Sequence, residues 1–329
     1  MIEFVALVVT YGTVKRKENL ISTIQSALTQ GANKVFVLSN GVQYDIDLVL
    51  TSEFNNKVQL IKYEENLGSA AGFTGGLREI FNCKEISDDT FILILDDDVN
   101  VEPNFLTNLT NLEKSQSNTH VWSMLRLGRD HTFDDKTDKS INYYFNSIAG
   151  FTLKSRLFPL KKERENPSIA KMIFAPWAGI VLQKKLLKDI VLPTSDYFVY
   201  EDDSQFCLNL RKKNIQILKS NSLLLSEISN SWFEDKNKNS GYKIFYESKN
   251  DDQLGRFLYM IRNNVYLIRE NKLVTNNLVY IFNILIFVVF GFLTYGNFHF
   301  KSFERLKLII GAINDGWQGK LGKNVKWKL

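Results

Sequence analysis

The stretch that decides the fold is FILILDDDVNVEP, residues 91–103. Five apolar residues, Phe91 to Leu95, predict a buried strand, and three consecutive carboxylates, Asp96, Asp97 and Asp98, follow where it ends. Side chains alternate along an extended chain, so Asp96 and Asp98 are expected to point the same way. Two carboxylates on one side can hold a hard divalent cation that also binds phosphate oxygens. The alternative is a solvated acidic turn in which Asp98 caps the next helix.

The residues before this stretch alternate between strand and helix patterns. Strands are predicted at 4–10, 34–39 and 58–63, and helices at 18–30, 72–81 and, beyond the carboxylates, 104–113. Such a βαβ series predicts an α/β fold with a mainly parallel, Rossmann-like sheet. Ligands of these sheets bind beyond the carboxyl ends of the strands. Polar residues follow those ends here and are expected to line one cleft: Thr10, Tyr11, Asn40, Asn66 and Asp96 to Asp98.

Small residues dominate NLGSAAGFTGG, residues 66–76. They allow the backbone to approach a ligand closely, and the helix that follows directs its first amides to that place. The segment is neither a Walker loop, which needs Gly-Lys-Ser/Thr, nor a dinucleotide fingerprint directly after the first strand. Gly72 within it is a candidate contact to a nucleotide.

A second acidic block lies in DYFVYEDDSQFCLNLRKKN, residues 196–214. Glu201, Asp202 and Asp203 stand where an aromatic-rich segment gives way to a predicted helix. One carboxylate is enough to cap a helix, so three indicate that at least one faces a site. A buried carboxylate can act as a general base toward a sugar hydroxyl.

The charge of the chain is concentrated at one end. Of the net charge of +5, all is carried by residues 297–329, which hold seven basic and two acidic residues, so the rest is neutral. A neutral body argues against a nucleic-acid-binding protein, whereas a basic tail favours an anionic membrane surface. Two cysteines in no metal-ligand spacing fit a reducing compartment.

With these elements in this order, the chain resembles the family 2 glycosyltransferases of GT-A fold, and among them the bacterial galactofuranosyl- and rhamnosyltransferases. The resemblance runs from Val5 to about Asn264 and rests on the DDD run, the EDD block and RFLYMIRNN, residues 256–264. NLGSAAGFTGG is similar to the glycine-rich loop of the galactofuranosyltransferases. In RFLYMIRNN, Tyr259, Arg262 and Asn263 match a Tyr-Tyr-x-x-Arg-Asn segment of both groups, with Leu258 in place of the first tyrosine.

The resemblance implies roles for most of these residues. Asp96 and Asp98 would bind the metal, Mg²⁺ or Mn²⁺, and Asp203 would be the catalytic base, with Asp202 beside it gripping the acceptor. The nucleotide-sugar site would comprise Thr10, Tyr11, Asn40, Asn66, Gly72, Asp96 and Asp97, and the acceptor site Trp177, Gly179, Glu201 and Asp202. The family commonly has a metal-binding histidine where this chain reads LLLSEIS, residues 223–229, so Glu227 is expected to supply an oxygen ligand instead.

The predicted division of the chain follows from these blocks. Residues 1–220 form a GT-A catalytic domain with a nucleotide-binding half, 1–100, and an acceptor half, 101–220. Residues 221–329 form a helical, membrane-associating region with an apolar helix at 278–296 and a basic amphipathic tail at 300–313. We expect the apolar helix to lie in the cytoplasmic leaflet of the bacterial inner membrane. A core or dimer helix is the alternative, and the sequence leaves open whether the chain pairs with itself.

The expected activity is inverting transfer of a sugar, with galactofuranose from UDP-galactofuranose favoured, to a lipid-linked or cell-surface polysaccharide precursor. Rhamnosyl transfer from dTDP-rhamnose and a non-catalytic, membrane-attached glycan-binding subunit are the alternatives. A nucleotidyltransferase would show a glycine-rich basic loop after the first strand, for which VTYGTVKRKEN, residues 9–19, is a poor match.

Overall fold

The computed structural model describes residues 2–116, 118–130, 140–158, 168–228, 241–248 and 254–329. The chain forms two compact units. Unit 1 comprises Met1–Asp138, Glu163–Ser195 and Asp202–Ser231, and unit 2 comprises Lys139–Lys162, Asp196–Glu201 and Trp232–Leu329. The division of residues 1–220 into a nucleotide half and an acceptor half stays a prediction.

A single sheet runs through unit 1, and its strand order is β3-β2-β1-β4-β8-β6-β9-β5, with β7 paired to β9. The strands are β1 (Phe4–Gly12), β2 (Val35–Val42), β3 (Val58–Tyr63), β4 (Phe91–Asp96), β5 (Val99–Val101), β6 (His120–Arg126), β7 (Ile169–Met172), β8 (Ile180–Gln183) and β9 (Gln216–Glu227). The first four strands in this order are parallel. Beyond β4 the sheet is mixed, because β8 enters antiparallel between β4 and β6.

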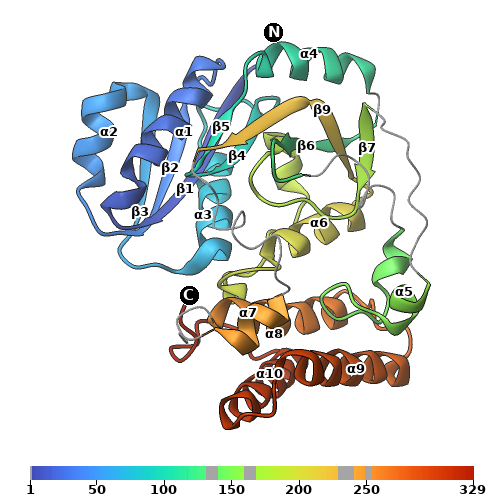
Figure 1. The fold of residues 1–329 in the computed structure, drawn as a ribbon. Coiled ribbons are helices and arrows are strands. Elements are labelled where there is room, and N and C mark those ends of the chain that lie inside the picture. Colours follow the sequence, from blue (N-terminus) through green and yellow to red (C-terminus); the bar gives the residue numbers. More distant parts are fainter. Residues whose placement is uncertain (1, 117, 131–139, 159–167, 229–240, 249–253) are drawn as a thin grey trace. The chain divides into compact units, whose positions relative to one another are not determined.

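Helices cover both faces of this sheet (Figure 1). The helices α1 (Lys17–Thr29), α2 (Ile46–Phe54) and α4 (Phe105–Ser115) pack on one face, against side chains that include Ala6 and Val8 of β1. On the other face α3 (Gly68–Asn82) and α6 (Asp202–Lys212) pack against Leu7 and Val9. Alternate residues of β1 therefore serve opposite cores, which explains its continuous apolar sequence.

The predicted βαβ elements are present in unit 1, and α2 is an additional helix that the sequence patterns did not indicate. Helix α3 begins at Gly68, four residues before the predicted start. Within the helix, a Cβ at Gly72 would lie 2.7 Å from Val9 Cγ1, so this glycine lets α3 pack closely against the sheet. Residues 68–71, expected before this helix, therefore form its first turn, and the contact of Gly72 to a nucleotide stays a prediction.

Unit 2 is helical, with α5 (Leu153–Leu157), α7 (Gly241–Glu247), α8 (Leu254–Glu270), α9 (Asn277–Tyr295) and α10 (Phe300–Gln318). Short 3₁₀ helices occur in both units: η1 (Val14–Arg16), η2 (Asn55–Lys57), η3 (Ile141–Tyr144), η4 (Lys184–Lys188) and η5 (Ser195–Tyr197). Within the described ranges, α9 is the one helix long and apolar enough to cross a membrane, and such a helix can equally belong to a protein core.

The amphipathic pattern of the tail needs one correction. Arg305 does not belong to an exposed basic face, since its guanidinium is buried and donates to the carbonyls of Phe245, Tyr246 and Ser248 at the end of α7. It therefore caps a helix within unit 2.

Candidate functional site

The three carboxylates at the end of β4 alternate in burial: Asp96 is the last residue of the strand, and Asp97 and Asp98 lie in the turn that follows. The expectation that Asp96 and Asp98 point the same way stays a prediction. Asp97 is buried, with 1% of its surface exposed, whereas Asp96 and Asp98 are half-buried. Register places Asp96 beside Val9 of β1, and Thr10 beside Ser39 of β2. The carboxyl ends of β2, β1 and β4 therefore meet at one edge of unit 1.

Asp97 is held by two groups from the start of the chain. Thr10 Oγ1 donates to Asp97 Oδ2 at 2.6 Å, and Arg16 donates to the same oxygen through Nε at 2.8 Å and to Oδ1 through Nη2. The guanidinium also lies 3.4 Å from Asp98 Oδ2 and 4.6 Å from the ring centre of Tyr11. Burial raises the pKa of Asp97, and the hydrogen bond from Arg16 opposes that rise. Thr10 and Asp97 thus bind each other in this structure, and their contacts to a donor stay predictions.

Asp96 shares an arginine with Glu227. The guanidinium of Arg126, buried in unit 1, donates to Glu227 Oε1 through Nε at 2.9 Å and lies 3.5 Å from Asp96 Oδ2. Arg129 Nη1 approaches Glu227 Oε1 at 3.6 Å. Burial raises the pKa of Asp96 to about 6, against the opposing charge of Arg126. Glu227 therefore has arginine partners, and its role as a metal ligand stays a prediction.

The chemistry of the donor set at this edge suits a hard divalent cation. Asp96, the last residue of β4, and Asp98, in the turn that follows, offer half-buried carboxylate oxygens, the ligand type that Mg²⁺ and Mn²⁺ prefer. Among the described residues, no group of three or more His, Cys, Asp or Glu side chains is gathered closely enough to hold a metal by itself. A cation here would thus need further oxygen ligands, such as those of a diphosphate.

Asn40 and Asn66 fix the turn that leads into α3. Asn40 Nδ2 donates to Gly68 O at 2.9 Å, and Asn40 Oδ1 accepts from Leu67 N at 2.9 Å. Asn66 Oδ1 accepts from Gly68 N at 2.9 Å. Both side chains lie near the carboxyl end of β2, where the sequence predicts a nucleotide site, and a direct contact of either to the donor stays a prediction.

Asp202 and Asp203 begin α6 and differ in environment. Asp202 is buried and accepts from Trp177 Nε1 at 2.8 Å and from Ser69 Oγ at 3.2 Å, which joins α6 to the first turn of α3. Burial raises its pKa. Asp203 is half-buried, and its Oδ1 accepts from Ser204 N at 2.7 Å. Of the two, Asp203 is the more accessible to a substrate.

Trp177 and Gly179 occupy core positions in unit 1. The indole of Trp177 is 4% exposed and stacks on Phe73, with ring centres 5.3 Å apart. Gly179 has a φ of +95°, and a Cβ there would meet Met124 Cβ at 3.0 Å, so the position requires glycine. Trp177 donates a hydrogen bond to Asp202. The contacts of Trp177 and Gly179 to an acceptor stay predictions.

The segment before Asp202 is held from within unit 2. Phe198, Tyr200 and Glu201 all have left-handed backbone conformations, with φ between +62° and +68°. The buried Asn263 Nδ2 lies 2.8 Å from Tyr197 O, 2.8 Å from Val199 O and 3.0 Å from Tyr200 O.

Its neighbours on α8 complete the arrangement. Arg262 Nε donates to Asn263 Oδ1 at 2.9 Å, and Asn264 Nδ2 donates to Glu201 Oε1 at 3.1 Å. The Arg-Asn-Asn run of α8 thus clamps residues 197–201, which lead directly into Asp202 and Asp203.

Comparisons with known proteins bear on the fold. The crystal structure of GalNAc-T7 with UDP, GalNAc and Mn²⁺ matches 83% of this chain and 50% of its own, with a TM-score of 0.53 at 10% identity. The fold of this chain is of the GT-A type. The chain spans about half the length of that structure. A mycobacterial protein of known structure matches with a TM-score of 0.47 at 12% identity, over 84% of this chain and 76% of its own. No family model and no curated protein sequence matches.

Sequence reasoning missed three residues of this GT-A edge: Arg16, Ser69 and Arg126. Arg16 lies in a charged run, VKRKEN, that does not indicate which basic side chain contacts a buried carboxylate. Arg126 ends a strand and has no acidic residue next to it in the sequence. The available signal was the alternation expected along residues 96–98, which turns Asp97 away from Asp96 and Asp98 and toward the core, where a carboxylate requires a partner.

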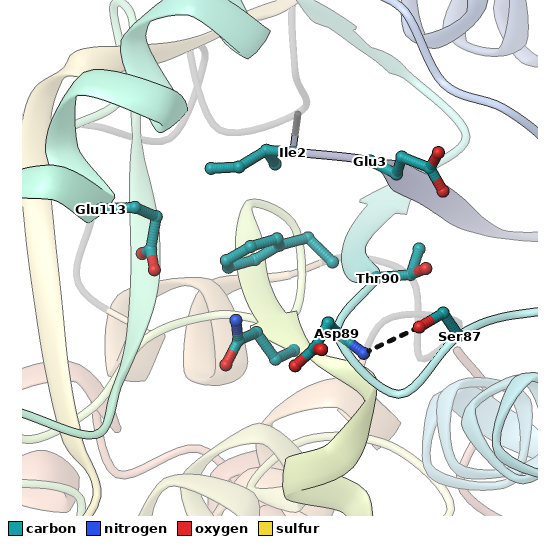
Figure 2. A pocket seen from close by; sticks show the side chains of 8 residues that line it. Ile2, Glu3, Ser87, Asp89, Thr90 and Glu113 are labelled. Carbon is teal, nitrogen blue, oxygen red and sulfur yellow. Dashed lines mark hydrogen bonds between the residues drawn. The ribbon is translucent and has the colours of Figure 1, made fainter.

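A pocket of about 440 Å³ lies elsewhere in unit 1, lined by residues that include Ile2, Glu3, Thr90 and Phe91 (Figure 2). These residues lie at the amino ends of β1 and β4, opposite the carboxylates. Ligands of α/β sheets bind at the carboxyl ends, so we do not assign the donor to this pocket.

Proposed function

We propose that this chain is a nucleotide-sugar glycosyltransferase whose donor site is the carboxyl edge of β2, β1 and β4. The observation that carries the proposal is the pair of half-buried carboxylates, Asp96 and Asp98, at the end of β4 in a sheet with a GT-A fold. The GalNAc-T7 structure of the same fold contains UDP and Mn²⁺, which supports a donor and a divalent cation of these classes.

The proposed reaction is a single displacement that inverts the anomeric carbon. Asp203 takes the proton of the acceptor hydroxyl, whose oxygen bonds to the anomeric carbon as the bond from that carbon to the diphosphate oxygen breaks. A divalent cation held by Asp96 and Asp98 would offset the charge on the departing diphosphate. Asp202, fixed by Trp177 and Ser69, sets the start of α6 and with it the position of Asp203.

The proposed donor is UDP-galactofuranose, with dTDP-rhamnose second. Support comes from the similarity of residues 66–76 to the glycine-rich loop of galactofuranosyltransferases. For the acceptor we propose a lipid-linked or cell-surface polysaccharide precursor at the cytoplasmic face of the bacterial inner membrane, supported by the apolar α9 and the basic tail of unit 2.

The test is release of UDP or dTDP by purified protein, with and without Mn²⁺ or Mg²⁺, in the presence of each donor and a lipid-linked glycan. Asp203→Asn should abolish turnover and keep donor binding by calorimetry. The exposed Asp189→Asn is the matched control and should leave both unchanged. Retention of more than about 5% of the rate in Asp203→Asn would place the base elsewhere. Tight dTDP-rhamnose binding with no UDP-galactofuranose response would reverse the donor assignment.

A further inference from the structure

Helix α9 has two unlike faces within unit 2. Its inner face is packed: Tyr280 stacks on Trp317 with ring centres 5.8 Å apart, and Phe287 and Phe292 are buried. Its outer face consists of large apolar side chains at helical spacing, each at least 43% exposed: Leu278, Ile281, Phe282, Leu285, Val289 and Leu293. An apolar stripe of this length on a protein surface marks an interaction site.

Hydrogen bonds on the inner face of α9 distinguish a helix that crosses a bilayer from one that lies along its surface. Asn283 Nδ2 donates to Asn146 O at 2.9 Å, and its Oδ1 accepts from Leu153 N at 3.0 Å. Tyr242 Oη donates to Phe287 O at 2.7 Å. A helix that crossed a bilayer would surrender these hydrogen bonds and expose their partners to hydrocarbon. A helix that lies along the membrane keeps them.

Charge decides between a lipid surface and a second copy of the chain. Exposed lysines precede and follow α9, with Lys272 before it and Lys301 and Lys307 after it, and residues 297–329 carry a net +5. Pairing two such outer faces would bring two positive tails together, which is unfavourable. Anionic phospholipid complements both the apolar stripe and the lysines.

We propose that the outer face of α9 is a membrane-docking surface that lies flat in a leaflet containing anionic phospholipid, with unit 2 on the aqueous side. The orientation places the whole chain, tail included, on one side of the bilayer. It deepens the proposed function by holding the enzyme at the surface where a lipid-linked acceptor resides.

The experiment is flotation of the full-length protein with vesicles of phosphatidylcholine alone or with 30 mol% phosphatidylglycerol. We expect flotation with the anionic vesicles and, for Leu285→Gln/Val289→Gln, at least a tenfold loss of binding. The control Leu48→Gln/Val191→Gln removes two exposed apolar side chains from unit 1 and should float like wild type. Circular dichroism melts check that each variant is folded.

Three outcomes would overturn the proposal. These are retention of wild type in the bottom fraction with both vesicles, unchanged flotation of the outer-face variant, and equal binding to neutral and anionic vesicles. A sedimentation shift from dimer to monomer in the outer-face variant, without vesicle binding, would instead assign this face to self-association.

The orientation of α9 in the membrane is measured by adding trypsin to the outside of vesicles that carry the bound protein. Cleavage after the exposed Lys320 or Lys323 is expected for a flat helix, and protection of the tail would show that α9 crosses the bilayer and refute the flat placement. Release of the nucleotide from the sugar donor in the presence of a soluble acceptor, measured without vesicles, tests the proposed function separately.

Discussion

Arg16→Met is expected to weaken unit 1, because it leaves the Asp97 carboxylate without its cationic partner. Asp97 is 1% exposed and would retain Thr10 as its one remaining hydrogen-bond donor among the side-chain partners described above. Removing one member of a buried ion pair typically costs about 3–5 kcal/mol. Since 28% of the Arg16 side chain is exposed, water reaches part of the pair, and we expect about 2–3 kcal/mol at pH 7.

The pH dependence of this loss has a defined sign. The Arg16 hydrogen bond lowers the pKa of Asp97, so the variant should have a higher Asp97 pKa than wild type. Its folded state then keeps a proton that the unfolded chain releases near pH 4, and its stability falls as pH rises from that value. The deficit relative to wild type should be largest at pH 7 and shrink toward pH 4.

Hydrogen exchange of the amides in β1 and β4 measures this loss within unit 1. At pH 7 the expected cost corresponds to exchange roughly 30- to 150-fold faster. Adding Asp97→Asn should recover at least about 1.5 kcal/mol of the loss. The control is Lys17→Met, whose ion pair to the exposed Glu18 is 4.0 Å long, with an expected cost below about 0.5 kcal/mol. Exchange in Arg16→Met within twofold of wild type, or a strictly additive double variant, would refute the reasoning.

Three further predictions concern the clamp, the metal and the packing of α3. Asn263→Asp replaces a buried amide donor with a carboxylate that faces three carbonyl oxygens, and it should destabilise unit 2 by about 2–4 kcal/mol. The control, Asn277→Asp at an exposed position, should change the stability by nearly zero. Equal melting temperatures of the two variants would contradict this prediction. Because the pKa of Asp96 is about 6, its carboxylate protonates below that pH, so Mn²⁺ affinity measured by calorimetry should fall between pH 7.5 and 5; constant affinity would remove Asp96 from the metal site. Gly72→Ala should cost about 1–3 kcal/mol in a melt because its Cβ would press on Val9, whereas Gly311→Ala, which meets open space, should not destabilise.

Local sequence was enough to predict the strands up to β4, the helices α1, α3 and α4, and the carboxylates after Leu95, although it missed α2. These features depend on patterns a few residues long: an apolar run for each buried strand, helical spacing for α1 and α4, and three acidic residues after Leu95. Such local rules hold before any tertiary contact is known.

The tertiary structure alone decided which groups surround those carboxylates. Arg16 meets Asp97 across 81 positions of sequence, and Arg126 meets Glu227 across 101. Both contacts depend on strand order, since β1 lies beside β4 and β6 beside β9, and no local pattern encodes that order. Whether a glycine serves a ligand or packing, as at Gly72, also depends on what lies opposite. Long-range pairing, set by burial of both faces of the sheet, therefore fixes the electrostatics of the site.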